Sequence, residues 1–493
     1  MDGMRWSSLV AVGLVACGPT VVVGADGSST STTGGPGSAS SPSTTAQPSD
    51  VSSISDAEVD VDDGSPHFDD FGVADLGGGG CDGGCAAVDV LFVIDNSGSM
   101  AEEQLALARA GVRWIGQMLA DGGSYDVQVM ITTTDMGNPL CTPFQPPGYD
   151  PAQGAPTMTG CNSRIDDFTG LGSNPISAPE ACTAVCPSDI TPGDPFLAID
   201  GSGSNVPDVP DADVDGDGVP DSPEAQALAC MLPQGINGCG YESPLEAMLQ
   251  ALEPGAAWNS GDRPFVRDNA KLAIVIVTDE SDCSVQDYSV VDDDYYFNVN
   301  PDTGLRGPSS ALCWNAGVTC TGPDANGVYT DCVAVPDGPL QEVTRYTTHL
   351  SDYLVGDLGK TVDFFALTGV PEVTEYSRQV PFEPTAGGIF DLVVHDWQDG
   401  VYPAGDILPE DAAAGVDAAQ KHFLFGIGPA CTGQDAGGDF TGQAVPNIRV
   451  FEVCQALDAG DAQHCFIDSI CAPGYDGALG TLWGTMVAQL GGD

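Results

Sequence analysis

The chain has 493 residues, and its 71 acidic and 13 basic side chains give a formal net charge of -58. Such a polyanion repels phosphate and has no basic surface to displace counterions, which argues against nucleic acid as a partner. Divalent cations or basic partners suit it better, although the acid excess could also serve only to keep a surface protein soluble. Hydrophobic residues make up 42% of the chain, enough for a sizeable core.

The first residues have the pattern of an export signal. Arg5 precedes an apolar run from Leu9 to Ala16, which is too short to span a bilayer. We therefore predict a signal peptide over residues 1–16. The run ends in Leu-Val-Ala-Cys, with Cys17 last, and this resembles the lipobox of bacterial lipoproteins. The resemblance implies a lipid on Cys17; the alternative is an ordinary signal peptide followed by a chance cysteine.

The predicted lipid sets the expected location. No later stretch is apolar for long enough to form a transmembrane helix, so we expect attachment to the membrane through the lipid alone. By resemblance to lipoprotein sorting in Gram-negative bacteria, Gly18 after the lipidated cysteine favours the outer membrane or cell surface. Residues 17–84 are rich in Ser, Thr, Gly and Asp and poor in large apolar side chains, which predicts a disordered linker.

Cysteine usage also indicates export. Of the 17 cysteines, an even number remains after Cys17 is set aside, as expected for disulfides formed in an oxidising compartment. The Cys-x3-Cys spacings have no matching second pair, so we do not expect zinc. Spacing suggests short-range disulfides but leaves their connectivity open: Cys81 with Cys85, Cys182 with Cys186, Cys230 with Cys239, and Cys313 with Cys320 or Cys332.

Strand and helix patterns alternate from residue 85 to the C-terminus. Apolar runs at 88–94, 125–134, 271–278 and 361–367 predict strands buried on both faces. Helical spacing is found at 105–119, 245–252, 340–354 and 479–486. This alternation predicts an α/β fold with a doubly wound, mostly parallel sheet. Three long insertions, near 137–229, 283–337 and 375–420, interrupt it, and their cysteines are expected to order them.

Oxygen donors follow two of the predicted strands. Asp95, Ser97 and Ser99 lie in the turn after 88–94, and Asp279 follows 271–278. In an open α/β sheet, ligands bind beyond the carboxyl ends of the strands. Carboxylates and hydroxyls select Mg²⁺, Mn²⁺ or Ca²⁺ over softer metals. The competing interpretation is that Ser97 or Ser99 only caps the following helix.

The spacing Asp95-x-Ser97-x-Ser99 after an apolar strand resembles the metal motif of the von Willebrand factor A (VWA) family. The sequence Ile-Val-Thr-Asp ending at Asp279 resembles the strand that supplies the family's distal aspartate. The resemblance covers most of residues 85–493 apart from the insertions, and it implies a VWA/Rossmann-like fold. It also implies a metal-ion-dependent adhesion site (MIDAS) in which Asp95, Ser97 and Ser99 contact Mg²⁺ (or Mn²⁺ or Ca²⁺). Asp279 would contact the ion directly or through water, and an open position would accept a carboxylate from a partner protein.

One position departs from the family pattern. The family commonly supplies a threonine hydroxyl from a second loop before a helix, and the matching stretch, 238–245, contains no threonine. Glu242 or Ser243 could take its place, and we prefer Glu242 for its longer reach. A second carboxylate would strengthen cation binding but weaken the attraction of the bound ion for an acidic partner.

A second acidic motif lies in the first insertion. Residues 213–224 resemble the calcium loop of EF-hands, with acids at the expected positions and Gly218 at the sixth. The preceding stretch is too rich in proline for an entering helix, so the resemblance is to the loop alone. The alternative is a solvated acidic loop in an acidic chain. The predicted Ca²⁺ ligands are Asp213, Asp215, Asp217, the carbonyl of Val219, Asp221 and Glu224.

Two further acids receive a plainer interpretation. Asp135, at the end of the second predicted strand, could line the metal cleft, but we prefer a surface carboxylate. We expect Glu103 to face outward from the first helix.

These patterns predict a binding protein rather than an enzyme, because the chain carries no serine nucleophile elbow, zinc-protease helix or phosphate loop. The leading hypothesis is a surface lipoprotein that uses its metal site for adhesion or protein binding. The alternatives are a structural scaffold of an envelope complex with a stabilising metal and, third, a hydrolase of unknown type.

Overall fold

The structure is a computed structural model that describes residues 86–120, 125–170, 176–261, 263–288, 298–307, 309–379, 381–435, 438, 440–458 and 463–490. The predicted signal peptide (1–16), the lipidation site Cys17 and the linker up to residue 84 lie outside the described residues. Within the described part of the chain, no helix combines the length and the apolar character needed to cross a membrane.

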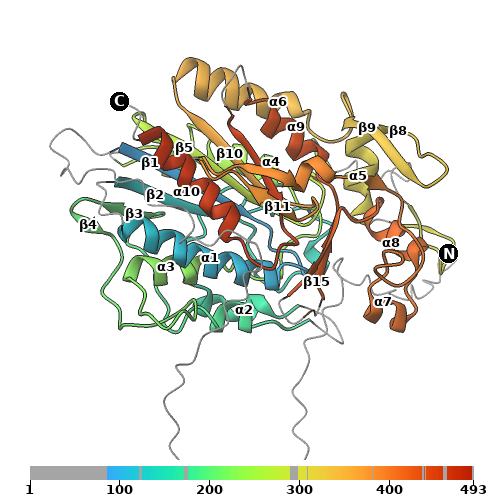
Figure 1. The fold of residues 1–493 in the computed structure, drawn as a ribbon, viewed down its shortest axis with the longest axis horizontal. Coiled ribbons are helices and arrows are strands. Elements are labelled where there is room, and N and C mark those ends of the chain that lie inside the picture. Colours follow the sequence, from blue (N-terminus) through green and yellow to red (C-terminus); the bar gives the residue numbers. More distant parts are fainter. Residues whose placement is uncertain are drawn as a thin grey trace, which may run out of the picture.

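A seven-stranded sheet forms the centre of the molecule, in the order β16-β10-β5-β1-β2-β3-β4 (Figure 1). The neighbours from β16 to β2 pair in parallel, and β3 and β4 continue the sheet in antiparallel pairing. The prediction of an α/β fold with a mostly parallel sheet is therefore confirmed, with strands at the four predicted places. The strands are β1 (Ala86–Ile94), β2 (Tyr125–Thr133), β3 (Leu197–Asp200), β4 (Gly203–Ser204), β5 (Ala270–Val277), β10 (Val362–Thr368) and β16 (Cys465–Ser469).

Apolar side chains fill both faces of this sheet, because successive residues of a strand point to opposite sides. Val90 and Phe92 of β1 belong to a core cluster that also contains residues of α1 (Ala101–Ala120), α3 (Pro223–Met231) and α10 (Asp476–Leu490). Leu91 and Val93 belong to the other cluster, with α4 (Pro244–Ala251), α6 (Val343–Thr347) and α9 (Ile448–Gln455). In Figure 1, α1 and α3 lie below the sheet, and α6 and α9 lie above it. Helices therefore cover both faces of the sheet.

The order of the strands places two loops side by side. From β1 the chain continues to β2 on one side, and it later returns to β5 on the other side of β1. The carboxyl ends of β1 and β5 therefore lie at the point where the connections diverge, which is the usual ligand position in an open α/β sheet. The register pairs Ile94 with Val277, so Asp95 and Thr278 follow at the same level.

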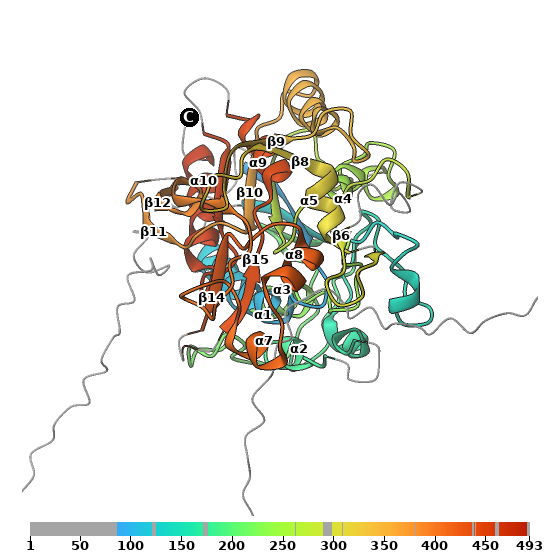
Figure 2. The same ribbon diagram turned by 90° about the vertical axis from the view of Figure 1, so that its right-hand side faces the viewer.

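The three insertions hold short elements of their own, and Figure 2 shows those of the second and third, such as α5 (Ala311–Gly317) and α8 (Ala418–Phe425), on the side of the molecule that faces the viewer. The first also supplies β3, which pairs with β2 and widens the sheet. The remaining elements of the fold are η2 (Thr142–Phe144), η3 (Cys161–Phe168), α2 (Glu180–Thr183), η4 (Ala257–Asn259), β6 (Asn298–Val299), β7 (Arg306–Gly307), β8 (Val318–Thr321), β9 (Val328–Ala334), η6 (Thr348–Asp357), β11 (Val373–Tyr376), β12 (Pro384–Gly387), η7 (Gly388–Asp391), β13 (Val394–His395), α7 (Pro409–Ala414), β14 (Cys431–Gln434) and β15 (Phe440–Ala444).

Disulfides cross-link the first and second insertions internally and tie the first insertion to α3 and to the loop before α4, while others link segments nearer the C-terminus. Among the described residues they link Cys141–Cys239, Cys161–Cys182, Cys186–Cys230, Cys283–Cys313, Cys320–Cys332, Cys431–Cys471 and Cys454–Cys465. The sulfur atoms of Cys161, Cys182 and Cys186 lie within 4.8 Å of one another because two disulfides pack together. Oxidised sulfurs are not the thiolates that zinc requires.

Most of the short-range pairings suggested by spacing are wrong. Cys182 and Cys186 are one helical turn apart, since the Cys186 N–H donates to the Cys182 carbonyl at 2.9 Å. Side chains at that spacing are about 5–6 Å apart at Cβ, too far for a disulfide. The other predicted pairs are broken up by bonds to more distant segments, and Cys81–Cys85 lies outside the described residues. Cys230 bonds to Cys186, Cys239 to Cys141 and Cys313 to Cys283, which leaves Cys320 to bond with Cys332.

Candidate metal centre

The carboxylate of Asp95 is fixed by contacts from two strand ends. Its backbone N–H donates to the Val277 carbonyl at 2.9 Å, which joins the turn after β1 to β5. The Thr278 hydroxyl donates to Asp95 Oδ2 at 2.6 Å, and the Ser97 N–H donates to Oδ1 at 2.8 Å. Asp95 is fully buried. The aspartate is thus held at the sheet edge by the adjacent strand and by its own turn.

The two serines of the motif and the distal aspartate lie beside it. The hydroxyl oxygens of Ser97 and Ser99 are 3.2 Å apart. A hydrogen bond from the Ser99 side chain reaches the carboxylate of Asp279. Asp279, the most exposed of the motif residues, has only 6% of its surface exposed, and its Oδ1 has no hydrogen-bond partner among the described residues. The structure therefore brings Asp95, Ser97, Ser99 and Asp279 together.

Glu242 completes this group from the loop before α4. Its side chain is fully buried and lies close enough to Asp95 for the two carboxyl groups to share a hydrogen bond. The Thr134 hydroxyl donates to Oε2 of Glu242, while Oε1 has no partner among the described residues. Ser243 points elsewhere, because its hydroxyl donates to the Cys283 carbonyl at 3.0 Å. Of the two candidates for the family's threonine, only Glu242 is directed toward Asp95.

The path of this loop depends on a close backbone approach. The Gly238 N–H donates to the Asn96 carbonyl at 2.7 Å. A Cβ at position 238 would lie 2.6 Å from that carbonyl oxygen and closer still to the Asn96 side chain. A side chain would therefore push the loop away from the Asp95 turn.

Burial raises the pKa values of all these acids. The pKa of Asp95 rises to about 6, mainly through desolvation. The pKa of Asp279 rises to about 8, through desolvation and then the charge of Asp95. Desolvation and the charges of Asp95 and Glu280 hold the pKa of Glu242 well above its usual range. The charged neighbours with the strongest effect are carboxylates, so without a cation the cluster must retain protons.

This donor set suits a hard divalent cation. It consists of carboxylate and hydroxyl oxygens, the ligands that Mg²⁺, Mn²⁺ and Ca²⁺ prefer. The unpartnered Oδ1 of Asp279 and Oε1 of Glu242 are buried acceptors, and leaving such groups unsatisfied costs free energy. A bound cation would satisfy both atoms and offset the repulsion between the carboxylates.

For two acids near this group, the preferred interpretation of the sequence is wrong. Asp135 is fully buried, not a surface carboxylate, and accepts hydrogen bonds from Gly137 N (2.8 Å) and Gln145 Nε2 (2.7 Å) of the first insertion. Glu103 is also buried, and desolvation and the charge of Asp279 hold its pKa well above its usual range.

Segments from other parts of the chain lie against the group. The Asn96 side chain donates to the Tyr149 hydroxyl at 2.8 Å, which brings in the first insertion. The Cys141–Cys239 disulfide ties the same insertion to the loop of Glu242. On another side, the Val445 N–H donates to the Asp279 carbonyl at 2.9 Å. The donor residues consequently lie beneath their neighbours, with little exposed surface.

The second acidic motif is only partly assembled. Asp213, Asp215 and Asp221 each bring a carboxylate oxygen to within 4.8 Å of the others. Asp217 and Glu224 do not belong to that group: an oxygen of Asp217 accepts from Val219 N at 2.6 Å, and one of Glu224 accepts from the Ser204 hydroxyl at 2.6 Å. Arg113 also approaches the group, with Nη1 3.6 Å from Asp215 Oδ2.

No protein-family model matches this chain, and no curated protein matches it.

Proposed function

We propose that residues 85–493 form a doubly wound, VWA-type domain that binds a divalent cation at the ends of β1 and β5. Its function is cation-dependent protein binding or adhesion at the bacterial envelope. The main support is the buried cluster of Asp95, Glu242 and Asp279. Two of its carboxylate oxygens have no hydrogen-bond partner in the described part of the chain, and the charged neighbours with the strongest effect on Glu242 and Asp279 are other carboxylates. A cluster of this kind is stabilised by a bound cation.

The proposed ligands are Asp95, Ser97, Ser99, Asp279 and Glu242, with Mg²⁺ (or Mn²⁺ or Ca²⁺) as the ion. A bound divalent ion supplies positive charge at the sheet edge, which can attract a carboxylate from a partner protein. Glu242 adds a carboxylate from the second loop to those of Asp95 and Asp279, and this reduces the remaining positive charge of the site. We therefore expect weaker attraction of acidic partners than in a site whose second loop contributes only a neutral hydroxyl.

A second candidate function is structural: the cation stabilises a scaffold of an envelope complex and contacts no partner. The burial of the donors favours it, because even Asp279 is only 6% exposed and the segments around Tyr149 and Val445 lie against the site. A partner carboxylate would have to reach the ion past these segments.

Calorimetric titration with Mg²⁺, Mn²⁺ and Ca²⁺ tests the cation site. We expect saturable binding by the wild type and none by Asp95→Asn. Asp468→Asn is the matched control, since Asp468 is also a buried carboxylate at a strand end, with the Tyr376 hydroxyl as its partner at 2.6 Å. Equal binding by the wild type and Asp95→Asn would overturn the proposed site.

The two candidate functions are separated by a binding experiment with the same variants. Immobilised wild-type and Asp95→Asn proteins are incubated with solubilised envelope proteins, with Mg²⁺ or with a chelator. Retention of a protein only by the wild type and only with Mg²⁺ supports adhesion. If Mg²⁺ raises thermal stability but changes no retention, the structural role is supported instead.

We further propose that the chain is exported and held at the outer membrane or cell surface by a lipid on Cys17. We also propose that Ca²⁺ binds the loop 213–224 and orders the first insertion. Asp213, Asp215 and Asp221 support this second ion site by their proximity, although Asp215 also lies near Arg113.

A further inference from the structure

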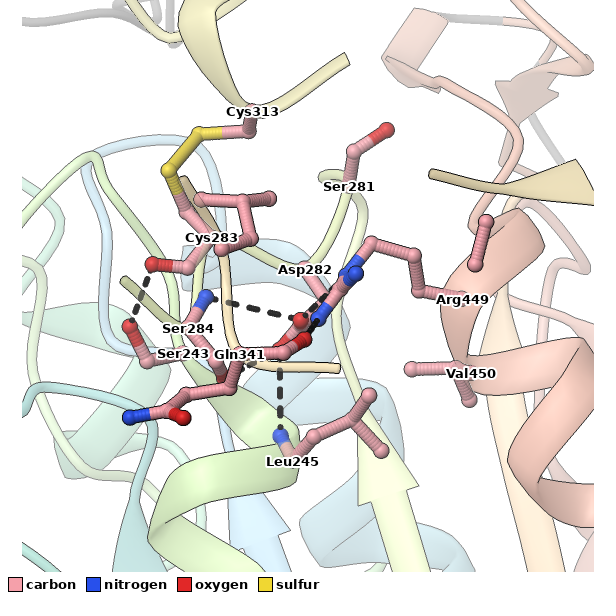
Figure 3. A network of polar contacts seen from close by, with 12 residues as sticks. Ser243, Leu245, Ser281, Asp282, Cys283, Ser284, Cys313, Gln341, Arg449 and Val450 are labelled. Carbon is pink, nitrogen blue, oxygen red and sulfur yellow. Dashed lines mark hydrogen bonds and ion pairs between the residues drawn. A yellow bond between two sulfur atoms is a disulfide. The ribbon is translucent and has the colours of Figure 1, made fainter. Parts of the chain in front are cut away.

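A buried ion pair lies beside the proposed cation site. Arg449 of α9 donates from Nε to Asp282 Oδ2 at 2.9 Å, and their side chains are 1% and 0% exposed (Figure 3). Asp282 follows Asp279 by three residues in the turn after β5. A buried pair of this kind gives little net stability over apolar residues, but removing one partner is costly. The presence of this ion pair is therefore better explained by the other contacts that Asp282 and Arg449 make.

Asp282 holds the start of α4. Its Oδ1 accepts from Leu245 N at 3.2 Å, in the first turn of that helix, and from the Ser284 hydroxyl at 2.7 Å. Ser243, at the N-cap position of α4, makes no side-chain cap bond. The helix is thus capped by a carboxylate from another segment, which also favours the positive end of the helix dipole.

Glu242 immediately precedes Ser243, the N-cap residue of α4. The Glu242 carbonyl accepts from Cys283 N at 2.6 Å, and the Ser243 hydroxyl donates to the Cys283 carbonyl at 3.0 Å. Ser284 Oγ in turn accepts from Glu246 N of α4 at 3.1 Å. The turn that begins with Asp279 therefore contacts the Glu242 loop and the first turn of α4 through three successive residues, 282 to 284.

Asn447 and Arg449, at the start of α9, hydrogen-bond to the turn after β5 from the side away from α4. Asn447 Oδ1 accepts from Asp282 N at 3.1 Å, and Asn447 Nδ2 donates to the Glu280 carbonyl at 2.8 Å. Arg449 Nη2 donates to the Gln341 carbonyl at 2.5 Å. Figure 3 shows Arg449 reaching Asp282 from α9, with Leu245 on the opposite side of the carboxylate.

We propose that Asp282 and Arg449 are positioning residues for the cation site, which set the place of Glu242 relative to Asp279. This inference rests on the proposed cation site. Neither residue is among the proposed ligands of the ion. Arg449 neutralises and orients Asp282, Asp282 caps α4, and the cap fixes the loop that carries Glu242. Without Arg449, the uncompensated Asp282 leaves this arrangement, and Glu242 no longer points to Asp95.

The test measures the Mn²⁺ dissociation constant of Arg449→Met by calorimetry. Lys421→Met is the matched control, because Lys421 and Asp411 form another buried ion pair, with Nζ and Oδ2 2.6 Å apart, in α8 and α7. Supporting groups around metal ligands typically contribute 10- to 100-fold to affinity. We expect Arg449→Met to raise the dissociation constant at least ~10-fold, and Lys421→Met to leave it within about twofold. Equal effects of the two substitutions would show that the Arg449–Asp282 pair contributes only to overall stability, and would overturn the inference.

A double-mutant cycle checks that Arg449 acts through Glu242. In a Glu242→Gln background, Arg449→Met should weaken Mn²⁺ binding by less than about twofold further, because the affected ligand is already lost. A full additional loss would contradict the proposed route. If Arg449→Met does not fold, Asp282→Asn takes its place, since its amide oxygen can still accept from the Leu245 N–H, while the amide nitrogen that replaces Oδ2 cannot accept from Arg449 Nε; we expect the same pattern with a smaller change.

Hydrogen exchange in the presence of chelator separates this inference from the cation proposal. Arg449→Met should speed exchange in the peptide 241–249 more than Lys421→Met does. If the wild type binds no Mn²⁺, the proposed function fails, and the exchange result alone decides whether the pair positions the Glu242 loop. Equal exchange in both variants would overturn the positioning role.

Discussion

The Thr278 hydroxyl donates to Asp95 Oδ2 at 2.6 Å from the neighbouring parallel strand. The other oxygen of the carboxylate accepts the Ser97 N–H at 2.8 Å, so both oxygens are oriented while each keeps a lone pair for another ligand. The aspartate is therefore in place before a cation arrives, which reduces the cost of organising the site on binding.

The cation-free protein should lose stability as pH rises. Asp95 and Asp279 have folded-state pKa values of about 6 and about 8, against 3.8 ordinarily. The folded state therefore binds more protons than the unfolded state between about pH 4 and 8. Its free energy of unfolding falls through that window. Urea unfolding in EDTA at pH 5, 6, 7 and 8 measures this, and Asp279→Asn should flatten the upper part. A wild-type profile that rises with pH would contradict it.

Glu242→Gln and Ser243→Ala should differ in cation affinity. The Glu242 carboxylate points to Asp95, whereas the Ser243 hydroxyl is bonded to the Cys283 carbonyl. Ligand charge tunes affinity in oxygen-only sites. We expect Glu242→Gln to weaken Mn²⁺ binding roughly tenfold or more and Ser243→Ala to weaken it much less, by calorimetry. A larger loss with Ser243→Ala would assign the second-loop ligand to Ser243.

The Cys141–Cys239 disulfide should contribute more stability than Cys320–Cys332. The first closes a separation of 98 residues and the second a separation of 12. Chain entropy gives about 4.7 kcal/mol for a loop near 100 residues and about 3 kcal/mol for one near 15. Urea unfolding of the two double Cys→Ala variants compares them. An equal loss would show that loop closure does not govern their contributions.

Calcium should protect the first insertion from proteolysis. Asp213 belongs to the assembled carboxylate group, and Asp217 does not. We expect Asp213→Ala to abolish the protection given by millimolar Ca²⁺, a range typical of extracellular sites at ~10⁻⁴ to 10⁻³ M, with Asp217→Ala as the milder control. Limited digestion with an endoproteinase that cleaves after acidic residues, with and without Ca²⁺, provides the measurement, since the insertion is rich in Asp and contains a single basic residue, Arg164. Identical cleavage of the wild type in both conditions would remove the second ion site.

Cys17→Ser should release the protein from membranes. Acylation of Cys17 is the proposed anchor, and the described residues contain no helix able to span a bilayer. Fractionation of cells that express each form, followed by immunoblotting, compares the membrane and soluble pools. Retention of Cys17→Ser in the membrane fraction at the wild-type level would refute lipid anchoring at this residue.

Local patterns in the sequence were enough to predict much of the sheet and its edge. The runs that form β1, β2, β5 and β10 are apolar because both faces of these strands are buried, which requires apolar side chains at consecutive positions. Asp95 and Asp279 could be predicted to meet because parallel strands end at one edge. β16 was not predicted, because it has only five residues, Cys465–Ser469, and two of them are polar.

Contacts between distant segments decided the rest. Spacing could not show that Glu242 turns to Asp95 and Ser243 away from it, since neighbouring side chains point in different directions only once the loop is folded. The burial of Asp135 depends on Gln145 and Gly137 of an insertion whose path the sequence does not state. The disulfide partners likewise depend on which segments pack together: Cys186 bonds to Cys230 across 44 residues, not to Cys182 one turn away. Residue type and period therefore determine strands and their ends, whereas packing across the chain determines which side chains face one another.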